Sequence, residues 1–312
     1  MQPQPLTRIL HYPVTAALIA AALTVTGIWW SGHDIEGLFM TSLVWEKLEL
    51  WRAFTSTLPH VDFFHLAFNL YWLWIFGTFL EKCYGHIRLV GIFALLAFTS
   101  STGEFIFLDG GVGLSGIGYG LWGLLWALEK NDPAFHGVLD QKTTRIFVVW
   151  FFLCIALTVT NVMPVANIAH GVGAGTGALL GLAMSSKPVI KRKCYAGLIV
   201  IVFLCVVGST SLWPWINLSG YAEAEIERAG LSALDRGEIS KAVKRLETAA
   251  HMRGAPARAW YNLGIAYHRQ NRYDHALVAY EQAAKMPDAT SEFQQSAKEM
   301  RTYWNNLKPF EK

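Results

Sequence analysis

The sequence predicts an all-α membrane protein: a polytopic helical bundle, followed by a smaller soluble domain built from helical repeats. Hydrophobic residues make up 53% of the chain and charged residues only 16%, whereas charged residues are about a quarter of an ordinary soluble domain. The charges are also unevenly placed, because residues 1–215 hold 12 Lys and Arg whereas residues 216–312 hold 14 in less than half the length. We therefore expect a membrane domain at 1–215 and a soluble domain at 216–312.

Seven apolar segments approach the length of about 20 residues that a helix needs to cross a bilayer. They cover residues 13–30, 61–80, 88–108, 112–128, 146–163, 168–186 and 195–214. The first has Arg8 ahead of it, as a signal peptide would, but its apolar run from Val14 to Trp30 is long and no convincing cleavage site precedes Ser31. We expect it to be retained, so that six spans plus a seventh form the bundle.

The distribution of Lys and Arg predicts the orientation, since cytoplasmic loops carry an excess of both. With a cytoplasmic N-terminus, only Lys47 and Arg52 face outward ahead of the soluble domain. The cations that face the cytoplasm are Arg8, Lys82, Arg88, Lys130, Lys142, Arg145, Lys187, Lys191, Arg192 and Lys193. Seven spans in a bacterial inner membrane then place the C-terminal domain in the periplasm. If the segment 195–214 only skimmed the membrane, this domain would be cytoplasmic.

The composition also argues against several classes of partner and cofactor. The net charge is +3 and no basic patch has the spacing typical of nucleic-acid binding. The four cysteines form no CxxC pair, so neither a zinc site nor a disulfide framework is indicated; they are Cys83, Cys154, Cys194 and Cys205. The sequence implies no metal and no organic cofactor.

Three of the predicted spans contain polar residues that a lipid environment does not require. His65 and Asn69 lie in the second span, Ser115 lies at the start of the fourth, and His170 lies at the start of the sixth. In the predicted orientation, all three groups are near the outer ends of their spans. Ionisable residues inside a membrane are costly and usually functional, so their shared depth indicates that the three groups converge.

Ser115 and His170 together predict nucleophilic catalysis. Ser115 follows a glycine-rich stretch, so a helix should begin at or near it, with free N–H groups that can hold an oxyanion. No Asp or Glu occurs from Val165 through Ser186, so we expect a Ser–His dyad with His170 as the general base. Each motif alone is weak evidence, because glycines and polar residues also serve helix packing in membranes.

Two further features suit this chemistry. His65 and Asn69 are four residues apart on one helix face, so both side chains could donate hydrogen bonds to one anionic oxygen. The alternative is a polar pair that joins two helices. Tyr119, one turn beyond Ser115, could either pack on the ring of His170 or simply fill space.

Small residues recur every three or four positions on two of the spans, which lets two helix backbones approach closely. They are Gly173, Gly177 and Gly181 on the sixth span and Gly116, Gly120 and Gly123 on the fourth. We therefore expect these two spans to touch, as a hydrogen bond between a serine on one and a histidine on the other requires.

Several short motifs occur in order along the chain. They are Trp51-Arg52, His65-x3-Asn69, Gly113-x-Ser115-Gly116 and Ala169-His170-x2-Gly173, with Gly77 and Glu81 at the inner end of the second span. In this order and on these spans, they resemble the rhomboid family of intramembrane serine proteases. The resemblance covers about residues 10–186 and extends to the seventh span. It implies a helical bundle whose catalytic serine lies below the membrane surface in a water-filled cavity.

The resemblance also implies roles for individual residues. Ser115 and His170 would form the dyad, and the oxyanion hole would consist of the Ser115 backbone N–H and the side chains of His65 and Asn69. The supporting residues would be Tyr119, which falls where the family places a tyrosine on the catalytic histidine, together with Gly113, Gly116 and Gly173. Trp51 and Arg52 would be structural residues of a loop in the outer leaflet, whereas the role of His60, which matches a histidine often found in the family, is open.

The C-terminal region contains an internal repeat of 34 residues, which is the period of tetratricopeptide repeats. Equivalent positions hold Gly230 and Gly264, Ala242 and Ala276, Leu246 and Tyr280, and Ala249 and Ala283, and the second unit adds Trp260, Leu263 and Tyr267. Two repeats are fewer than usually suffice, so we expect Ser291 to Leu307 to form a capping helix. Such repeats bind proteins or peptides; the alternative is a dimerising or stabilising appendage.

Together, these features predict an intramembrane serine endopeptidase that cleaves transmembrane or membrane-anchored proteins in the bilayer, while the repeats recruit a substrate or another protein. By resemblance, cleavage would favour small residues near the outer face. The rival hypothesis is a non-catalytic scaffold or chaperone that binds transmembrane helices and uses the repeats as an adaptor. A proton-coupled transporter is disfavoured, because Glu104 is the one acidic residue that approaches mid-membrane.

Overall fold

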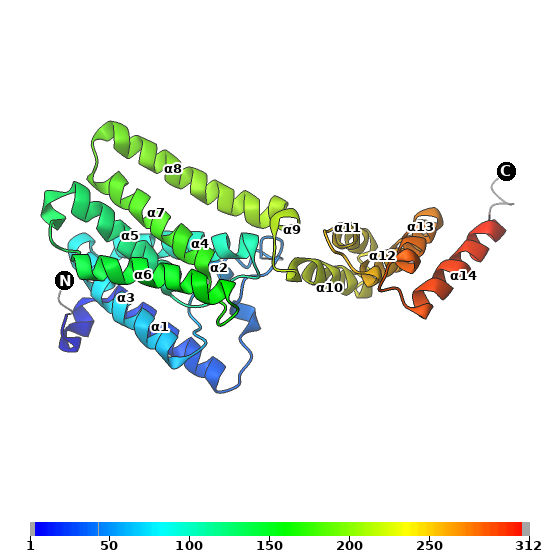
Figure 1. Ribbon diagram of the computed structural model, residues 1–312, viewed down its shortest axis with the longest axis horizontal. Helices are drawn as coiled ribbons and strands as arrows, with labels where there is room; N and C mark the ends of the chain where they lie inside the picture. The colour runs from blue at the N-terminus through cyan, green and yellow to red at the C-terminus, as the bar shows by residue number, and fades with distance from the viewer. Residues whose placement is uncertain (1–3, 43, 308–312) are drawn as a thin grey trace. The chain divides into compact units, whose positions relative to one another are not determined.

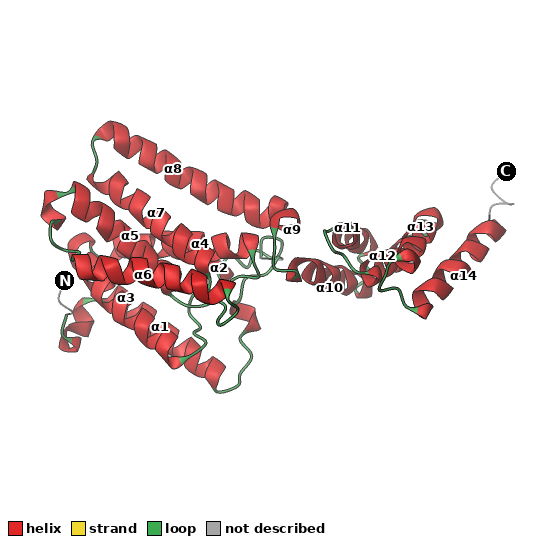
Figure 2. Ribbon diagram, in the orientation of Figure 1, coloured by secondary structure: helices red, strands yellow, loops and turns green. Residues whose placement is uncertain are grey.

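The computed structural model describes residues 4–42 and 44–307, and in this part of the chain it contains helices and loops but no strand (Figure 2). The contacts divide the chain into two units, Met1–Ser211 and Leu212–Lys312. The division lies close to the boundary expected from the charge distribution. Residues 1–3 and 308–312, which belong to the two expected domains, lie outside the described residues. The all-α fold class predicted from the sequence is confirmed.

The first unit contains eight α-helices within its described residues (Figure 1). They are α1 (Pro13–Trp30), α2 (Arg52–Thr55), α3 (Phe63–Tyr84), α4 (His86–Phe107), α5 (Ser115–Asn131), α6 (Gln141–Val159), α7 (Asn167–Ser185) and α8 (Pro188–Val207). Short 3-10 helices cover Leu6–His11, Glu36–Leu38 and Pro133–Phe135, and a π-helical turn, Gly208–Leu212, follows α8. The helix α9 (Trp213–Ile216) continues from this turn.

Six of the described helices, α1, α3, α4, α6, α7 and α8, are long and apolar enough to cross a membrane. The remaining predicted span, 112–128, forms α5, which has 17 residues. At 1.5 Å per residue it is about 25 Å long, shorter than the hydrocarbon layer of about 30 Å. Most of α5 is buried among its neighbours, so it is the central helix of the bundle. It begins only at Ser115, because the preceding glycine loop is not helical.

Two predicted spans begin later than the helices of the structure. The span predicted at 146–163 is the helix α6, which starts earlier because the Asp140 carboxylate caps it by accepting a hydrogen bond from Thr143 N at 2.7 Å. It ends at Val159, before Asn161 adopts a positive φ of 55°. The span predicted at 195–214 starts at Pro188, which suits the first helical position because its missing N–H would be unpaired there.

The first helix is attached to the bundle by a carboxylate from another helix. Glu81 on α3 accepts hydrogen bonds from Val14 N at 2.9 Å and Thr15 N at 3.0 Å, two of the N–H groups that have no partner within α1. Gly77 lies one turn before Glu81, and a Cβ there would come within 2.8 Å of the Thr15 side chain. The Gly77 and Glu81 motif therefore serves the contact between α1 and α3.

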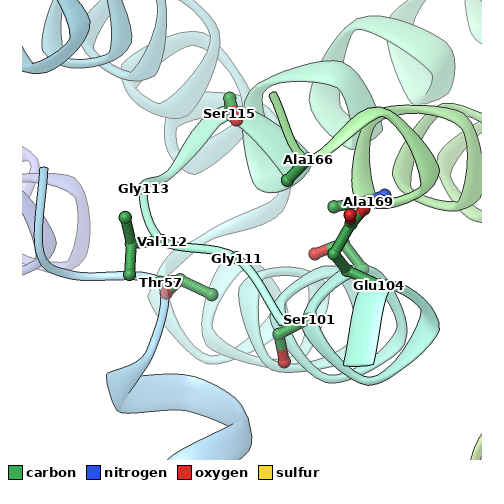
Figure 3. Close-up of a pocket in the computed structure, with 11 residues that line it drawn as sticks. Thr57, Ser101, Glu104, Gly111, Val112, Gly113, Ser115, Ala166 and Ala169 are labelled. Atoms are coloured by element: carbon green, nitrogen blue, oxygen red, sulfur yellow. Dashed lines mark hydrogen bonds between the residues drawn. The ribbon is translucent and has the colours of Figure 1, made fainter. Parts of the chain in front are cut away.

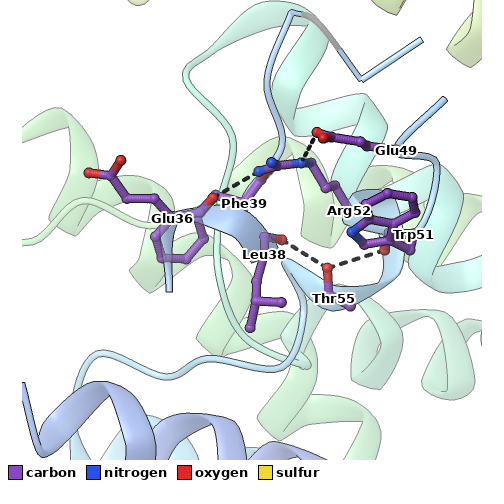
Figure 4. Close-up of polar contacts among 7 residues, drawn as sticks. All are labelled: Glu36, Leu38, Phe39, Glu49, Trp51, Arg52 and Thr55. Atoms are coloured by element: carbon purple, nitrogen blue, oxygen red, sulfur yellow. Dashed lines mark hydrogen bonds and ion pairs between the residues drawn. The ribbon is translucent and has the colours of Figure 1, made fainter. Parts of the chain in front are cut away.

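Arg52 organises the long loop between α1 and α2 (Figure 4). Its Nη1 donates to the carbonyl oxygens of Glu36 at 2.8 Å and Phe39 at 3.0 Å, and its Nε donates to the Glu49 carboxylate at 2.6 Å. Thr55 adds a bond from its hydroxyl to the carbonyl of Leu38 at 2.9 Å. A planar guanidinium can reach three acceptors at once, so this residue fixes the loop as expected from the sequence.

The helices α5 and α7 lie against each other along their glycine-rich faces (Figure 1). A Cβ at Gly173 would overlap the carbonyl oxygen of Gly116, and a Cβ at Gly177 would overlap that of Gly120. A Cβ at Gly181 would lie 2.6 Å from the carbonyl oxygen of Leu124. Only glycine lets the two backbones come this close, and the predicted contact between these two spans is confirmed.

The second unit contains the repeats. Its helices beyond α9 are α10 (Tyr221–Asp235), α11 (Ile239–Ala250), α12 (Ala257–Arg269), α13 (Tyr273–Lys285) and α14 (Ser291–Leu307). A Cβ at Gly230 would lie 2.7 Å from the Leu246 side chain, and a Cβ at Gly264 would lie 2.7 Å from the Tyr280 ring. The same small-against-large contact thus joins both helix pairs at equivalent positions, and α14 packs on α13 where the capping helix was expected.

Replacing Gly177 by alanine should destabilise the bundle, because the new Cβ overlaps the carbonyl oxygen of Gly120 and forces α5 and α7 apart. We expect the free energy of unfolding to fall by about 1–3 kcal/mol, the usual cost of overpacking. Thermal unfolding of the purified protein in detergent measures it. Gly175→Ala on the same helix is the matched control, since a Cβ there has nothing within 4 Å. Equal melting temperatures for the two variants would contradict the argument.

Candidate active site

Ser115 and His170 meet where the first turns of two adjacent helices come together. Ser115 is the first residue of α5, and His170 lies in the first turn of α7. The Nε2 atom of His170 is 2.8 Å from Ser115 Oγ, which is a hydrogen-bond distance. Within residues 4–42 and 44–307, the buried Nδ1 atom of His170 has no hydrogen-bond partner. The pair has the geometry of a nucleophile and base without a third residue bonded to the imidazole.

Tyr119 holds the imidazole from one side. Its ring stacks on that of His170 with centroids 4.5 Å apart and planes 28° from parallel. Its hydroxyl donates a hydrogen bond to the carbonyl oxygen of Phe147 on α6 at 3.1 Å. The stacked contact expected from the sequence is therefore present, and the hydrogen bond to Phe147 fixes the tyrosine to a neighbouring helix.

The loop before Ser115 depends on glycine. Gly113 has a φ of 102°, a conformation that residues with a side chain rarely adopt. A Cβ there would lie 2.5 Å from Cε1 and 2.7 Å from Nε2 of His65. The imidazole of His65 therefore packs directly on the backbone of Gly113, two residues before Ser115.

His65 and Asn69 have unused hydrogen-bonding capacity. Among the residues that the structure describes, His65 Nδ1 and Asn69 Nδ2 are buried and have no hydrogen-bond partner. Most buried polar groups in proteins have a hydrogen-bond partner. The structure brings His65 against the loop that carries Ser115, whereas Asn69 lies one turn farther along α3. Both nitrogens are therefore available for a further hydrogen bond.

His60, whose role the sequence left open, supports the start of α5. The ring is fully buried, its Nδ1 lies 2.9 Å from the carbonyl oxygen of Leu58, and its Nε2 accepts a hydrogen bond from Leu114 N at 3.3 Å. The pKa of His60 is lowered to about 3, mainly by burial and to a smaller extent by the neighbouring His65. The ring is therefore neutral, as an acceptor at Nε2 requires.

His60 is itself held by the first helix. The Trp30 side chain donates to the carbonyl oxygen of His60 at 2.9 Å, and the Thr26 hydroxyl donates to that of Leu58 at 3.3 Å.

Three histidines gather around this site. However, in the described part of the chain, no group of three His, Cys, Asp or Glu side chains is placed to hold a metal ion.

A small pocket lies beside Ser115 (Figure 3). Its lining comprises Thr57, Ser100, Ser101, Glu104, Gly111, Val112, Gly113, Ser115, Gly116, Ala166 and Ala169. The sequence suggests for Glu104 only the role of a transporter carboxylate, and it does not predict that Glu104 lines the same pocket as Ser115. Its position near the outer end of a span, at the depth of Ser115 and His170, was the available signal.

Comparisons with known proteins give a consistent result. Residues 47–187 match the family model of the Rhomboid domain, and residues 228–292 match that of the Tetratricopeptide repeat. The chain is also similar to the Rhomboid protease GlpG of Enterobacter sp. (strain 638), with 31% identity over 187 residues. That alignment covers 58% of this chain and 65% of the relative's length.

Replacing Gly113 by alanine should slow any reaction at Ser115. The Cβ would displace the His65 ring and strain a positive φ, and we expect the rate to fall by about 10²-fold, as it can when a group at a reacting centre is displaced by about 1 Å. The rate of Ser115 labelling by a fluorophosphonate probe measures this effect. Gly137→Ala is the control for backbone strain, because Gly137 has a φ of 77° and open space around it. Similar rates in both variants would show that contact with His65 is unimportant.

Proposed function

Because the chain is a multi-pass integral membrane protein with a rhomboid domain at residues 47–187 and a tetratricopeptide-repeat region at residues 228–292, we propose that it is an intramembrane serine protease. The observation that carries the proposal is the 2.8 Å contact between Ser115 Oγ and His170 Nε2 inside the helical bundle. The substrates would be transmembrane or membrane-anchored proteins. The name of the relative, a rhomboid protease, supports the same reaction class.

The reaction would proceed through an acyl-enzyme. Ser115 Oγ attacks the carbonyl carbon of the scissile peptide bond while His170 Nε2 accepts the serine proton. His170 then donates this proton to the leaving amine, so that the peptide bond breaks and the substrate's N-terminal part remains as an ester on Ser115. A water molecule, deprotonated by His170, hydrolyses the ester and restores the serine.

The negative charge on the substrate's carbonyl oxygen would be stabilised by three donors. Ser115 contributes its backbone N–H, which lies at the start of α5 where the helix dipole favours an anion. The side chains of His65 and Asn69 contribute the other two, and their buried unpartnered nitrogens support this role. Donors that are fixed in advance in a buried site need little reorganisation, so each is worth about 2.7–4 kcal/mol in typical serine proteases.

Tyr119 would keep the imidazole in place through the reaction. A catalytic histidine is usually oriented by an acid bonded to its second nitrogen, and here Nδ1 of His170 has no such partner among the described residues. The stacked tyrosine, anchored on the Phe147 carbonyl, supplies the orientation instead. Gly116 and Gly173, which permit the contact of the two helix backbones, support the same geometry.

The proposed location is a bacterial inner membrane, with the N-terminus in the cytoplasm and the repeats in the periplasm. The distribution of Lys and Arg supports this orientation. Since α5 runs from Ser115 to a last turn that holds Lys130, one of the cations expected to face the cytoplasm, Ser115 would lie toward the periplasmic face. Cleavage would then occur in the outer part of the substrate's transmembrane segment.

The repeats would recruit a substrate or another protein. The helices α10 and α12 are joined by Arg258, whose side chain donates to Glu227 at 2.8 Å and Glu223 at 3.3 Å. Tyr261 on α12 stacks on Phe293 of α14 at 4.4 Å. These contacts make a continuous framework of the first helices of successive units, which is the surface that such repeats use for binding peptides.

Replacing either Ser115 or His170 by alanine should abolish cleavage of a model transmembrane substrate in liposomes. Loss of a nucleophile or base of this kind costs about 10⁶-fold in kcat in a well-studied serine protease, so no product should be detected. Unchanged melting temperatures would show that both variants remain folded. Cleavage that survives in either variant would exclude that residue as essential, and no cleavage or probe labelling by the wild type would favour the rival scaffold function.

Deleting residues 217–312 should impair natural substrates more than a generic one. If the repeats act as a recruiting site, their loss raises KM for substrates that dock on them and leaves kcat unchanged, since the reacting groups are in the other unit. Parallel assays with a natural substrate and with a short model transmembrane helix would separate these effects. Equal losses for both substrates would indicate that the repeats stabilise the protein instead.

A further inference from the structure

Glu104 joins α4 to the start of α7. It lies in the last turn of α4, is 2% exposed, and accepts a hydrogen bond from Ala169 N at 2.8 Å (Figure 3). Ala169 belongs to the first turn of α7, whose N–H groups have no partner within the helix. A carboxylate at this position also faces the positive end of the helix dipole. Glu104 therefore caps α7 from a different helix.

The helix α7 lacks a cap from its own sequence. Its N-cap residue is Ala166, whose side chain has no hydrogen-bonding group, and no side-chain bond caps the helix there. The side chain of Asn167 is used elsewhere, because its Nδ2 donates to Thr158 Oγ1 at 2.8 Å. The position of the first turn of α7 therefore depends on a side chain that comes from α4.

The same carboxylate lies against the loop that leads to Ser115. A Cβ at Gly111 would come within 2.6 Å of the Ala166 side chain and 3.5 Å of Glu104 Cγ. The end of α4, the glycine loop and the start of α7 thus meet at Glu104. Figure 3 shows Glu104 directed toward Ala169. One buried side chain is bonded to the start of α7 and lies close to the loop that leads to Ser115.

The geometry of His170 is sensitive to the position of this turn. Its Nδ1 has no hydrogen-bond partner among the described residues, so the ring is placed by its backbone and by Tyr119. A misplacement of about 1 Å in a catalytic group can cost about 10²-fold in rate. A shift of that size in the residue after Ala169 would break the contact between His170 and Ser115.

We propose that Glu104 is a positioning residue, which holds the first turn of α7 through Ala169 and so keeps His170 within hydrogen-bonding distance of Ser115. The inference rests on the proposed function of these two residues as a dyad. In a protease triad, an acidic residue bonds to the side chain of the catalytic histidine. Here the acidic residue, Glu104, bonds instead to the backbone of the helix that carries His170. Glu104 does not touch the substrate in this role.

The chain contains a matched control. Glu81 is also a buried glutamate that caps a membrane helix from a neighbouring helix, through Val14 N and Thr15 N of α1. It lies at the other end of α3 from His65. Glu81→Leu and Glu104→Leu therefore make the same chemical change at two helix starts, only one of which carries His170.

The experiment compares four full-length proteins in detergent: wild type, Glu104→Leu, Glu104→Gln and Glu81→Leu. For each protein it measures the rate of fluorophosphonate labelling of Ser115, kcat and KM for cleavage, and the melting temperature. For Glu104→Leu we expect labelling and kcat to fall about 10- to 100-fold with little change in KM. Glu104→Gln should stay within about threefold of wild type, because its amide oxygen accepts the same hydrogen bond. Glu81→Leu should lower the melting temperature but label at the wild-type rate.

Two results would overturn the proposal: labelling of Glu104→Leu at the wild-type rate, or equal slowing by Glu81→Leu. Amide hydrogen exchange in Asn167–His170 gives a second measurement that does not depend on activity. Exchange there should accelerate in Glu104→Leu and stay unchanged in Glu104→Gln. If the wild type were not labelled at all, the protease function would fail, and the exchange data alone would still decide whether Glu104 holds the helix. Unchanged exchange in Glu104→Leu would refute that.

Discussion

The close approach of α5 and α7 is the constraint on which the rest of the membrane unit depends. The two backbones touch where Gly173 and Gly177 face the carbonyl oxygens of Gly116 and Gly120. This separation places Ser115 Oγ and His170 Nε2 at 2.8 Å. In lipid there is little hydrophobic driving force between helices, so packing of small residues supplies much of the association. The same contact therefore stabilises the bundle and sets the distance between Ser115 and His170.

A second theme is the capping of helices by side chains from elsewhere in the bundle. The first N–H groups of a helix need partners, and lipid supplies none. Glu81 meets this need for α1, Glu104 for α7, and His60 for Leu114 at the start of α5. The start of α5 carries Ser115, and the start of α7 carries His170. Glu104 and His60 thus connect these two helix starts to other parts of the fold, so stability and geometry are coupled there.

Several misses have physical causes. Hydropathy predicts too late a start for α6, because the helix begins at the cap that Asp140 provides, ahead of the apolar run. The importance of Glu104 was missed because its partner, Ala169 N, is 65 residues away, and no spacing rule connects them. Likewise, His60 was recognised but not explained, since its acceptor role depends on a loop that lies beside it only after folding.

The sequence by itself determined the all-α class, the apolar spans, the 34-residue repeat and the candidate pair Ser115 and His170. These follow from local properties: the length of apolar runs, the spacing of small residues and the rarity of polar groups in lipid. Only the tertiary structure decided which helix starts meet, which side chains cap them, and how the rings of Tyr119 and His170 stack. Such contacts join residues far apart in the chain, and their distances are set by the packing of whole helices.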